Sequence, residues 1–555
     1  MQVTIKAKQG TMYALAVDGV GAEQAPASYV NFFDRKKGYA ELPPTPMALE
    51  QFLNWARDVG VDLKVPTPIH VAMEKEERKR DLFSWASVVE GRDELDNRLY
   101  EHQKIGVAYA LINKQFNGGK FRLLIADDPR LGKSPQSLVA LKNSEPGRVL
   151  ILCPKALLLQ WKTYVETWLE PDGFRSLVLR GSEKTRKQDL DTFFQFEEEG
   201  WKVVITNWES MYMNSLNLNS RGFVYFIGDE AHKLKNRKSK IVTAVGNLTI
   251  PNIILLSATF VEDMPSDWWA PLNIIAPNRY TSYWRWVGHY IESYWGGYGI
   301  EFGAPRHMDI MKDDVRPYIL QRRSDEVADM PEKIKETLVC EMADWHEEFY
   351  RKLETQTRIE LSEGILSVPN VISRITRLRQ AAVHPMLLDK EFDGRGYETG
   401  KMEMLKILFE DVIPFDQQAI IYCSFIDGCE AIRRTLEDHA SFIYAGAQAY
   451  ESDIQKFQDG EHRIMIGTPG KGGVGLNLFN ANYVVFADMP WSTISVRQAE
   501  ERVRAIGKQG PVYVYTLALA NTVDAYVTAK VQAKLANVGE SEVLQLAHDY
   551  LEHKS

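Results

Sequence analysis

A short charged segment with one glycine, residues 127–134, carries the residue types that bind phosphate. It reads Asp-Asp-Pro-Arg-Leu-Gly-Lys-Ser and follows an apolar run, which predicts a strand, a loop and the start of a helix. Backbone N–H groups at a helix N-terminus bind phosphate oxygens, and Lys133 would neutralise the charge of the β- and γ-phosphates. The Ser134 hydroxyl is a magnesium ligand in such loops. The segment therefore predicts a triphosphate site, although Asp127 stands where the common phosphate-loop pattern has its first glycine.

A pair of acids, Asp229 and Glu230, ends a later apolar run. Magnesium prefers hard oxygen ligands, so Asp229 is the natural partner of Ser134. Glu230 can polarise the water molecule that attacks the γ-phosphate. A third run ends in Ser-Ala-Thr at residues 257–259, whose hydroxyls can sense the phosphate state. With the phosphate loop, these residues predict ATP and Mg2+ as the cofactors.

Both motifs have a structural alternative when each is taken alone. A Gly-Lys-Ser sequence also occurs by chance in surface loops, and an acidic pair also ends a strand as a solvated terminus. Their occurrence in order, each after its own apolar run, favours the triphosphate site.

Eleven short apolar runs must position these residues, and they fall into two blocks. Each is continuous rather than alternating in hydrophobicity, which is typical of parallel strands that helices cover on both faces. Most spacers between them are long enough for crossover helices. The first block comprises residues 122–128, 149–154, 176–181, 203–208, 223–230 and 252–259, and the second comprises 419–425, 441–446, 463–469, 483–489 and 512–518. The predicted fold class is α/β, with two doubly wound parallel-sheet lobes.

The remaining segments complete the predicted domain organisation. Residues 260–400 lack strand runs and carry helical patterns such as 345–365, so they are expected to form helical insertions and a linker. The predicted domains are a small N-terminal accessory domain (1–95), lobe 1 (96–275), helical insertions and linker (276–400), lobe 2 (401–530) and a C-terminal helix (531–555).

The composition excludes several classes of protein. Lys and Arg number 66 and Asp and Glu 75, a net charge of −9, so binding of nucleic acid through overall positive charge is excluded, whereas a local basic groove is not. No apolar run approaches the roughly 18 residues of a membrane span, and the first residues lack a signal peptide's apolar stretch. The four cysteines are too few and scattered for a disulfide scaffold or a zinc site: Cys153, Cys340, Cys423 and Cys429. We expect a cytoplasmic, bacterial or phage-type monomer without membrane contact.

The ordered motifs resemble helicase superfamily two, and within it the Swi/Snf-type double-stranded DNA translocases. The resemblance extends from about residue 98 to 530. It is carried in lobe 1 by the sequences at 98–111, 127–134, 150–161, 228–236 and 256–259, between the lobes by 315–333 and 378–385, and in lobe 2 by 419–425, 466–478 and 498–508. The resemblance implies two RecA-like lobes.

ATP is implied to lie between the lobes. Lys133, Asp229 and Glu230 would act from lobe 1, and Gln498 and Arg502 from lobe 2, with Arg502 as an arginine finger on the γ-phosphate. The resemblance further implies nucleotide contacts from Gln103, which reads adenine in the family, and from Leu131, Gly132, Lys133, Ser134, His232 and Gly475.

Double-stranded DNA is the implied partner, and alternating closure of two DNA-gripping lobes would move the protein along it. The implied DNA-contacting residues are Pro154, Lys155, Lys235, Lys238, Ser424, Thr468, Gly473 and Trp491. The basic run 233–240 is equally compatible with a solvated face. The rings of residues 268–298 are expected to pack in a helical core rather than to stack on bases.

Two departures from the family pattern affect catalysis. The family usually has an arginine where this chain has Ala505, and we predict that Arg504, one residue earlier, substitutes for it. Pro129 and Arg130 replace a common Met-Gly pair, which removes a residue with easy access to positive φ. Two alternatives to a DNA translocase therefore stay open: a strand-separating helicase, and a scaffold that binds nucleotide and DNA with weak turnover.

Overall fold

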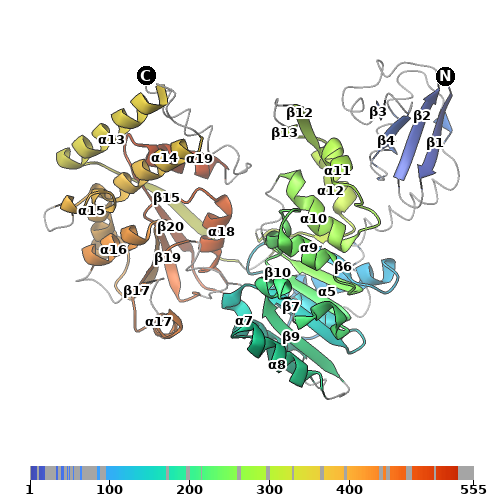
Figure 1. Ribbon diagram of the computed structural model, residues 1–555. Helices are drawn as coiled ribbons and strands as arrows, with labels where there is room; N and C mark the ends of the chain where they lie inside the picture. The colour runs from blue at the N-terminus through green and yellow to red at the C-terminus, as the bar shows by residue number, and fades with distance from the viewer. Residues whose placement is uncertain are drawn as a thin grey trace. The chain divides into compact units, whose positions relative to one another are not determined.

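The computed structural model describes most of the chain from residue 95 to 534 and parts of residues 2–87 (Figure 1). The gaps after residue 95 are 170–173, 196–199, 214–215, 259–263, 296–299, 325, 328–329, 363–367, 393–396, 437–441, 445–449, 470–477 and 506–507. The chain divides into two compact units, Met1–Glu326 (unit 1) and Val327–Ser555 (unit 2).

Unit 1 contains a seven-stranded parallel sheet in the order β14-β6-β11-β10-β7-β9-β8. Its strands are β6 (Arg122–Ile125), β7 (Arg148–Cys153), β8 (Phe174–Val178), β9 (Trp201–Asn207), β10 (Tyr225–Asp229), β11 (Asn252–Leu256) and β14 (Ile319–Leu320). Every residue of β9 and β11 is buried, as their continuous apolar runs predict.

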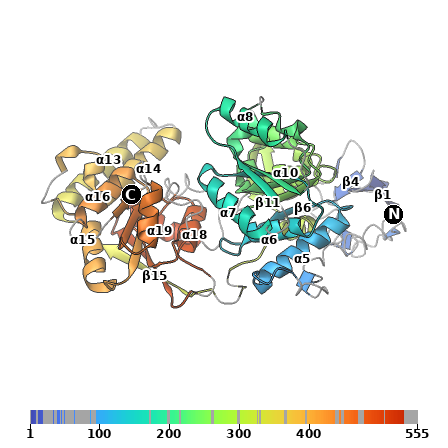
Figure 2. The same cartoon turned by 90° about the horizontal axis from the view of Figure 1, so that it is seen from below.

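Helices flank this sheet (Figure 2). The described helices of unit 1 are α5 (Glu101–Phe116), α6 (Lys133–Lys142), α7 (Leu158–Leu169), α8 (Glu183–Phe193), α9 (Lys240–Gly246), α10 (Pro265–Ile275), α11 (Tyr283–Tyr290) and α12 (Met308–Val315). Unit 1 also holds an antiparallel pair, β12 (Ile291–Trp295) and β13 (Ile300–Pro305).

A separate five-stranded sheet lies within residues 1–95, in the order β3-β4-β2-β1-β5. Its strands are β1 (Gln2–Lys8), β2 (Met12–Asp18), β3 (Phe33–Asp34), β4 (Tyr39–Leu42) and β5 (Leu63–Lys64). All its pairs are antiparallel except β1 with β5.

Unit 2 contains a six-stranded parallel sheet in the order β15-β20-β19-β16-β18-β17. Its strands are β15 (Lys333–Cys340), β16 (Gln418–Tyr422), β17 (Phe442–Tyr444), β18 (Ile464–Gly467), β19 (Ala481–Phe486) and β20 (Val512–Leu519). Its helices are α13 (Asp344–Ser362), α14 (Val368–Val383), α15 (Gly400–Ile407), α16 (Ile426–Thr435), α17 (Tyr450–Gln458), α18 (Thr493–Glu501) and α19 (Val523–Lys534). The predicted α/β class with two parallel-sheet lobes is confirmed.

The expectation that residues 260–400 hold no strands is wrong. Four described strands lie there: β12 and β13 pair with each other, β14 joins the sheet of unit 1, and β15 pairs with β20 in unit 2 over eight residues. β14 has only two residues, and β15 is a largely exposed edge strand, so neither produces a continuous apolar run. The boundary between the units lies inside the predicted linker, and the domain limits stay predictions; the predicted helix 531–555 lies largely outside the described residues.

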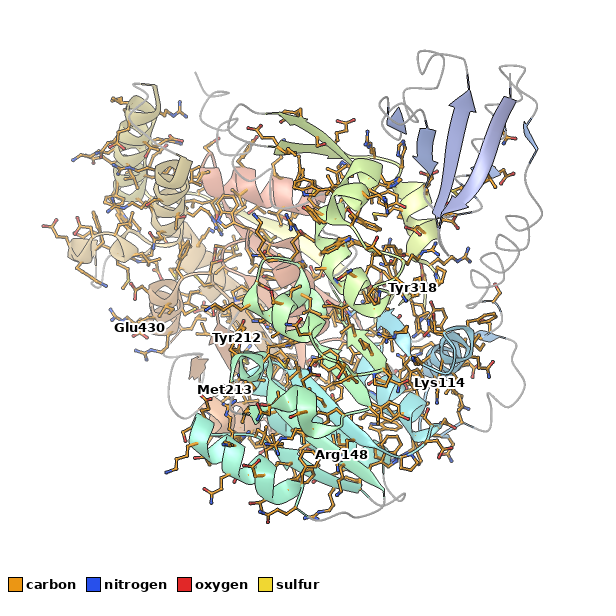
Figure 3. All side chains as sticks on the ribbon, turned by 45° about the vertical axis from the view of Figure 1, so that its right-hand side comes forward. Lys114, Arg148, Tyr212, Met213, Tyr318 and Glu430 are labelled. Atoms are coloured by element: carbon orange, nitrogen blue, oxygen red, sulfur yellow. The ribbon has the colours of Figure 1, made fainter. Side chains whose placement is uncertain are left out.

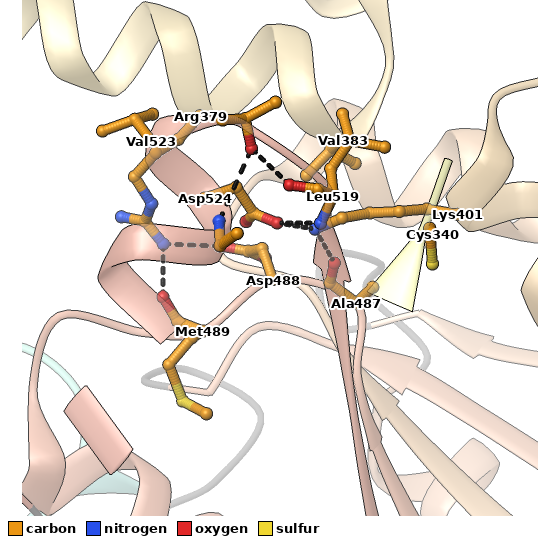
Figure 4. A network of polar contacts seen from close by, with 12 residues as sticks. Cys340, Arg379, Val383, Lys401, Ala487, Asp488, Met489, Leu519, Val523 and Asp524 are labelled. Carbon is orange, nitrogen blue, oxygen red and sulfur yellow. Dashed lines mark hydrogen bonds and ion pairs between the residues drawn. The ribbon is translucent and has the colours of Figure 1, made fainter. Parts of the chain in front are cut away.

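Buried ion pairs connect the helices of unit 2 to the end of β19 (Figure 4). Arg379 on α14 contacts Asp488 at 2.7 Å, and Lys401 on α15 contacts Asp524 at 2.7 Å. The Lys401 ammonium also donates to the carbonyl oxygen of Ala487 at 2.7 Å. Because a buried charge is costly unless it is paired, these contacts hold α14, α15 and α19 against the sheet.

The aromatic-rich segment packs largely as predicted. Four of its rings are at most 5% exposed: Trp268, Tyr280, Trp286 and Tyr290. Trp284 and Tyr294 are instead 53% and 57% exposed. The four cysteines are free and buried, and no described helix is both long and apolar enough to cross a membrane.

Candidate nucleotide-binding site

The phosphate loop connects β6 to α6 through two residues in the left-handed conformation. Gly132 precedes the helix with a φ of 74°, and Arg130 has a φ of 73°. A Cβ atom at Gly132 would lie 2.0 Å from the Nε2 atom of Gln103, so the loop requires glycine at this position. Glycine reaches this conformation without strain, whereas the backbone of Arg130 is strained in it. Backbone strain of this kind is typical of functional loops.

Lys133 is the first residue of α6, and its side chain turns back onto the loop. The Nζ atom donates to the carbonyl oxygens of Asp127 at 2.8 Å and Asp128 at 3.1 Å. Burial lowers the pKa of Lys133, while the negative charges of Asp127 and Glu230 oppose this shift. Ser134 follows in the first turn, where the helix dipole favours anions.

Asp229 is the last residue of β10, and its carboxylate is held by two donors. The Trp161 Nε1 donates to Oδ2 at 2.8 Å, and the Glu230 backbone N–H donates to Oδ1 at 2.9 Å. Burial and the neighbouring charge of Glu230 raise the pKa of Asp229 to about 7. Glu230 itself has a φ of 53°, and its Oε2 lies 3.1 Å from Nδ1 of His232. The predicted acids therefore form an ordered group.

The sheet order brings these motifs to one edge. β11 lies between β6 and β10, so the phosphate loop and the acidic pair leave the sheet from the carboxyl ends of nearby strands. Ser257 follows β11, and its backbone N–H donates to the Ile125 carbonyl oxygen at 3.1 Å. The Ser257 hydroxyl is buried without a hydrogen-bond partner among the described residues. A cation, two carboxylates and a helix N-terminus thus share one edge of a parallel sheet, where such folds bind phosphates.

The residues present fit a magnesium ion held jointly with a nucleotide. Ser134 and Asp229 supply hard oxygen atoms. No group of three or more His, Cys, Asp or Glu residues that could hold a metal exists within the described ranges. An ion here would therefore take further ligands from phosphate oxygens and water.

Gln103 of α5 packs against the phosphate loop. Its Oε1 accepts from the Tyr100 backbone N–H at 3.0 Å, and its Nε2 lies 3.4 Å from the Leu131 carbonyl oxygen. The side chain is buried, as is Leu131. The contact of Gln103 with adenine stays a prediction.

The predicted arginines of unit 2 are both buried within that unit. Arg502 donates from Nη1 to the Tyr422 hydroxyl at 2.9 Å. Arg504 donates from Nε to the Pro331 carbonyl oxygen at 3.0 Å and forms a 3.0 Å ion pair with Glu501. Gln498 lies half-buried on α18, and Gly475 lies outside the described residues. Their action on a nucleotide stays a prediction.

The predicted DNA-contacting residues differ in exposure. Lys155 and Lys238 are exposed, whereas the others that the structure describes are half-buried: Pro154, Lys235, Ser424, Thr468 and Trp491. The Arg379 guanidinium lies 4.6 Å from the Trp491 ring centroid. Gly473 lies outside the described residues.

Sequence reasoning missed two residues that order the site. Trp161 ends the motif that predicted Pro154 and Lys155, but its bond to Asp229 was not foreseen. Arg322 forms a buried ion pair with Asp127. The signal for this ion pair was Asp127, which stands where a glycine is expected. A buried carboxylate needs a cationic partner.

Comparison with known proteins identifies related sequences. The model of the SNF2-related domain matches residues 100–387, and that of the helicase conserved C-terminal domain matches residues 400–507. A probable ATP-dependent DNA helicase, CHR12, of Arabidopsis thaliana is 25% identical over 475 residues, 79% of this chain and 41% of that protein. The uncharacterized ATP-dependent helicase MG018 of Mycoplasma genitalium is 26% identical over 450 residues, 78% of this chain and 41% of that protein. The chain thus spans about two fifths of the length of these relatives.

Two solved structures are also similar. The Sulfolobus solfataricus SWI2/SNF2 ATPase core in complex with dsDNA is 21% identical with a TM-score of 0.38, and the match covers 82% of this chain and 96% of that one. The Pyrococcus furiosus Hef helicase domain is 14% identical with a TM-score of 0.47, covering 76% and 98%. The match to the SNF2-related domain alone includes more than half of this chain. The chain therefore belongs to the SNF2-related family.

Proposed function

We propose that this chain is a DNA-dependent ATPase that couples ATP hydrolysis to translocation on double-stranded DNA. The observation that carries the proposal is the meeting of the phosphate loop and the Asp229–Glu230 pair at one sheet edge. The ATP-dependent helicases among the relatives support the same activity.

The residues of the nucleotide-binding site in unit 1 each have a separate task in this proposal. The N–H groups at the start of α6 and the Lys133 ammonium bind the β- and γ-phosphates. Glu230, oriented by its contact with His232, accepts a proton from the attacking water. Ser134 and Asp229 would hold Mg2+, which would neutralise charge on the phosphate oxygens.

Residues of unit 2 complete the proposed reaction. Arg502 or Arg504 would stabilise negative charge on the transferred γ-phosphoryl group. From unit 1, Lys155 and Lys238 would contact DNA phosphates. Phosphates carry no sequence information, so one enzyme can track any sequence.

ATP hydrolysis with and without duplex DNA tests the activity. We expect duplex DNA to stimulate hydrolysis, and Lys133→Ala to abolish it, because no other residue of the loop carries an ammonium to the phosphates. Lys187→Ala removes an exposed lysine of α8 in the same unit and serves as the control. Nucleotide binding without hydrolysis in the wild type would favour the scaffold instead.

Displacement of a third strand from triplex DNA tests translocation. A translocase displaces the third strand and leaves the duplex intact, whereas a strand-separating helicase also releases the duplex strands. Displacement that requires ATP, without strand separation on forked DNA, is the expected result.

A further inference from the structure

Asp127, which replaces the expected glycine of the phosphate loop, forms a buried two-point ion pair with Arg322. The Arg322 Nε donates to Oδ1 of Asp127 at 3.0 Å, and Nη2 donates to Oδ2. The side chains are 5% and 0% exposed. The two residues lie 195 positions apart, so the loop depends on a distant part of unit 1.

The same guanidinium joins both helices that border the loop. Nη1 donates to the His102 carbonyl oxygen on α5, and Nη2 donates to the Gln136 Oε1 on α6 at 2.8 Å. Gln136 in turn donates from Nε2 to the Leu131 carbonyl oxygen at 2.9 Å. Arg322 therefore reaches both the start and the middle of the loop.

Gly106 of α5 shows that the packing around this network is tight. A Cβ atom at Gly106 would lie 1.8 Å from Gln136 Oε1 and 2.9 Å from Arg322 Nη2. Only glycine leaves room for the two polar side chains here. The helix surface is thus shaped to admit the guanidinium.

Backbone contacts extend the connection along residues 318–324. The carbonyl oxygen of Tyr318, a residue labelled in Figure 3, accepts from the Leu124 N–H at 2.8 Å. The Asp128 N–H donates to the Arg322 carbonyl oxygen at 3.0 Å, and the Ser324 N–H donates to Asp128 Oδ2 at 2.9 Å. This segment ends directly before the boundary between the units, after Glu326.

We propose that Arg322 is a positioning residue that holds the phosphate loop in its nucleotide-binding shape and ties it to the segment leading into unit 2. This role rests on the proposed function, in which the loop binds the phosphates of ATP. Lys133 donates to the carbonyl oxygen of Asp127, which is the ion-pair partner of Arg322. A displacement of Arg322 would therefore move Asp127 and with it the ammonium group of Lys133. Removing one partner of a buried ion pair leaves an uncompensated charge, which would displace the loop.

Substitution of Arg322 tests this role through the affinity for ATP. We expect Arg322→Gln to raise the KM for ATP, and the Kd for the fluorescent analogue mant-ATP, by about tenfold or more. Arg322→Lys keeps the charge but not the two-point geometry and should give an intermediate value. Arg323→Gln changes the adjacent, exposed arginine and is the matched control.

A double-mutant cycle separates positioning from a purely structural effect. Asp127→Asn should weaken mant-ATP binding like Arg322→Gln, and the double variant should be no weaker than either single one, because neutral amides can pair. Thermal unfolding identifies the variants that fold. If Arg322→Gln does not fold, the cycle is made from Arg322→Lys, Asp127→Asn and the double variant that combines them. Additive losses, or lower stability with wild-type affinity, would overturn the proposal.

The binding measurement also separates this proposal from the proposed function. If the wild-type chain binds mant-ATP but does not hydrolyse ATP, the proposed ATPase function is wrong. The affinities of the Arg322 variants for mant-ATP still test the positioning role in that case. Wild-type affinity in folded Arg322→Lys and Arg322→Gln would contradict the positioning role even if the enzyme is active.

Discussion

The indole nitrogen of Trp161 donates a 2.8 Å hydrogen bond to the carboxylate of Asp229, and so connects α7 to the end of β10. Trp161→Phe removes this donor but keeps most of the buried ring volume. We expect the Mg2+ concentration for half-maximal ATPase activity to rise severalfold, because Asp229 loses a bond that orients it. Trp201→Phe, a buried indole of β9 in the same sheet, is the control. An unchanged Mg2+ titration would contradict the orienting role of Trp161.

Gly132 must stay a glycine because of both its conformation and its neighbour. Gly132→Ala places a Cβ atom 2.0 Å from Gln103 Nε2 and costs roughly 1–2 kcal/mol for the left-handed backbone. We expect the loss of measurable ATP binding. Gly118→Ala has the same backbone cost at a φ of 66°, but no atom lies within 4 Å of the new Cβ. Measurable ATP binding by Gly132→Ala, at the affinity of Gly118→Ala, would contradict the prediction.

The ion pair between Arg504 and Glu501 allows a test of the predicted arginine finger. Arg504→Ala should lower the kcat of DNA-stimulated hydrolysis by about 10³-fold if this arginine acts on the γ-phosphate. Glu501→Gln removes the partner but leaves the arginine, so kcat should fall far less. Unchanged hydrolysis in Arg504→Ala would contradict the prediction, and equal losses in both variants would assign Arg504 a structural role.

Buried His346 makes unit 2 less stable in mild acid. Burial lowers its pKa to about 4, while its Nε2 contacts the Ala381 carbonyl oxygen at 2.8 Å, and the charges of His384 and Lys401 also disfavour protonation. The unfolded chain binds a proton near pH 6.5, so this stabilisation is complete above pH 6.5 and declines as the pH falls towards 4. The loss at pH 5 is about 2 kcal/mol. In urea unfolding at pH 7 and pH 5, the free energy of unfolding of His346→Gln should depend less on pH than that of the wild type. An identical pH dependence would contradict the role of His346.

The sheet cores could be predicted because their sequence signal is local. All eleven apolar runs overlap a strand of the two parallel sheets, and α6 begins at Lys133, within the segment 127–134 that predicted the start of a helix. β14 and β15 were missed because distant pairing, not local hydrophobicity, makes them strands. A short or exposed edge strand has no continuous apolar pattern to detect.

The site could be predicted only in part for the same reason. The spacing of Lys133, Asp229 and Glu230 within motifs marked them as candidates, and the sheet order brings their strands to one edge. Arg322 could not be paired with Asp127 from spacing, since folding alone joins residues 195 positions apart. The positive φ of Arg130 was also hidden, because arginine seldom adopts this conformation, which glycine reaches easily.

The pairing of β15 with β20 has a consequence for biosynthesis. Among the described strands β15 pairs only with β20, and about 170 residues separate the two, whereas all the described strands of the unit 1 sheet have been made once Leu320 is reached. At a translation rate of roughly 5–20 residues per second, β15 waits about 10 to 30 seconds for its partner. Unit 1 can therefore fold on the ribosome while the first strand of unit 2 is still exposed to chaperones and to other nascent chains.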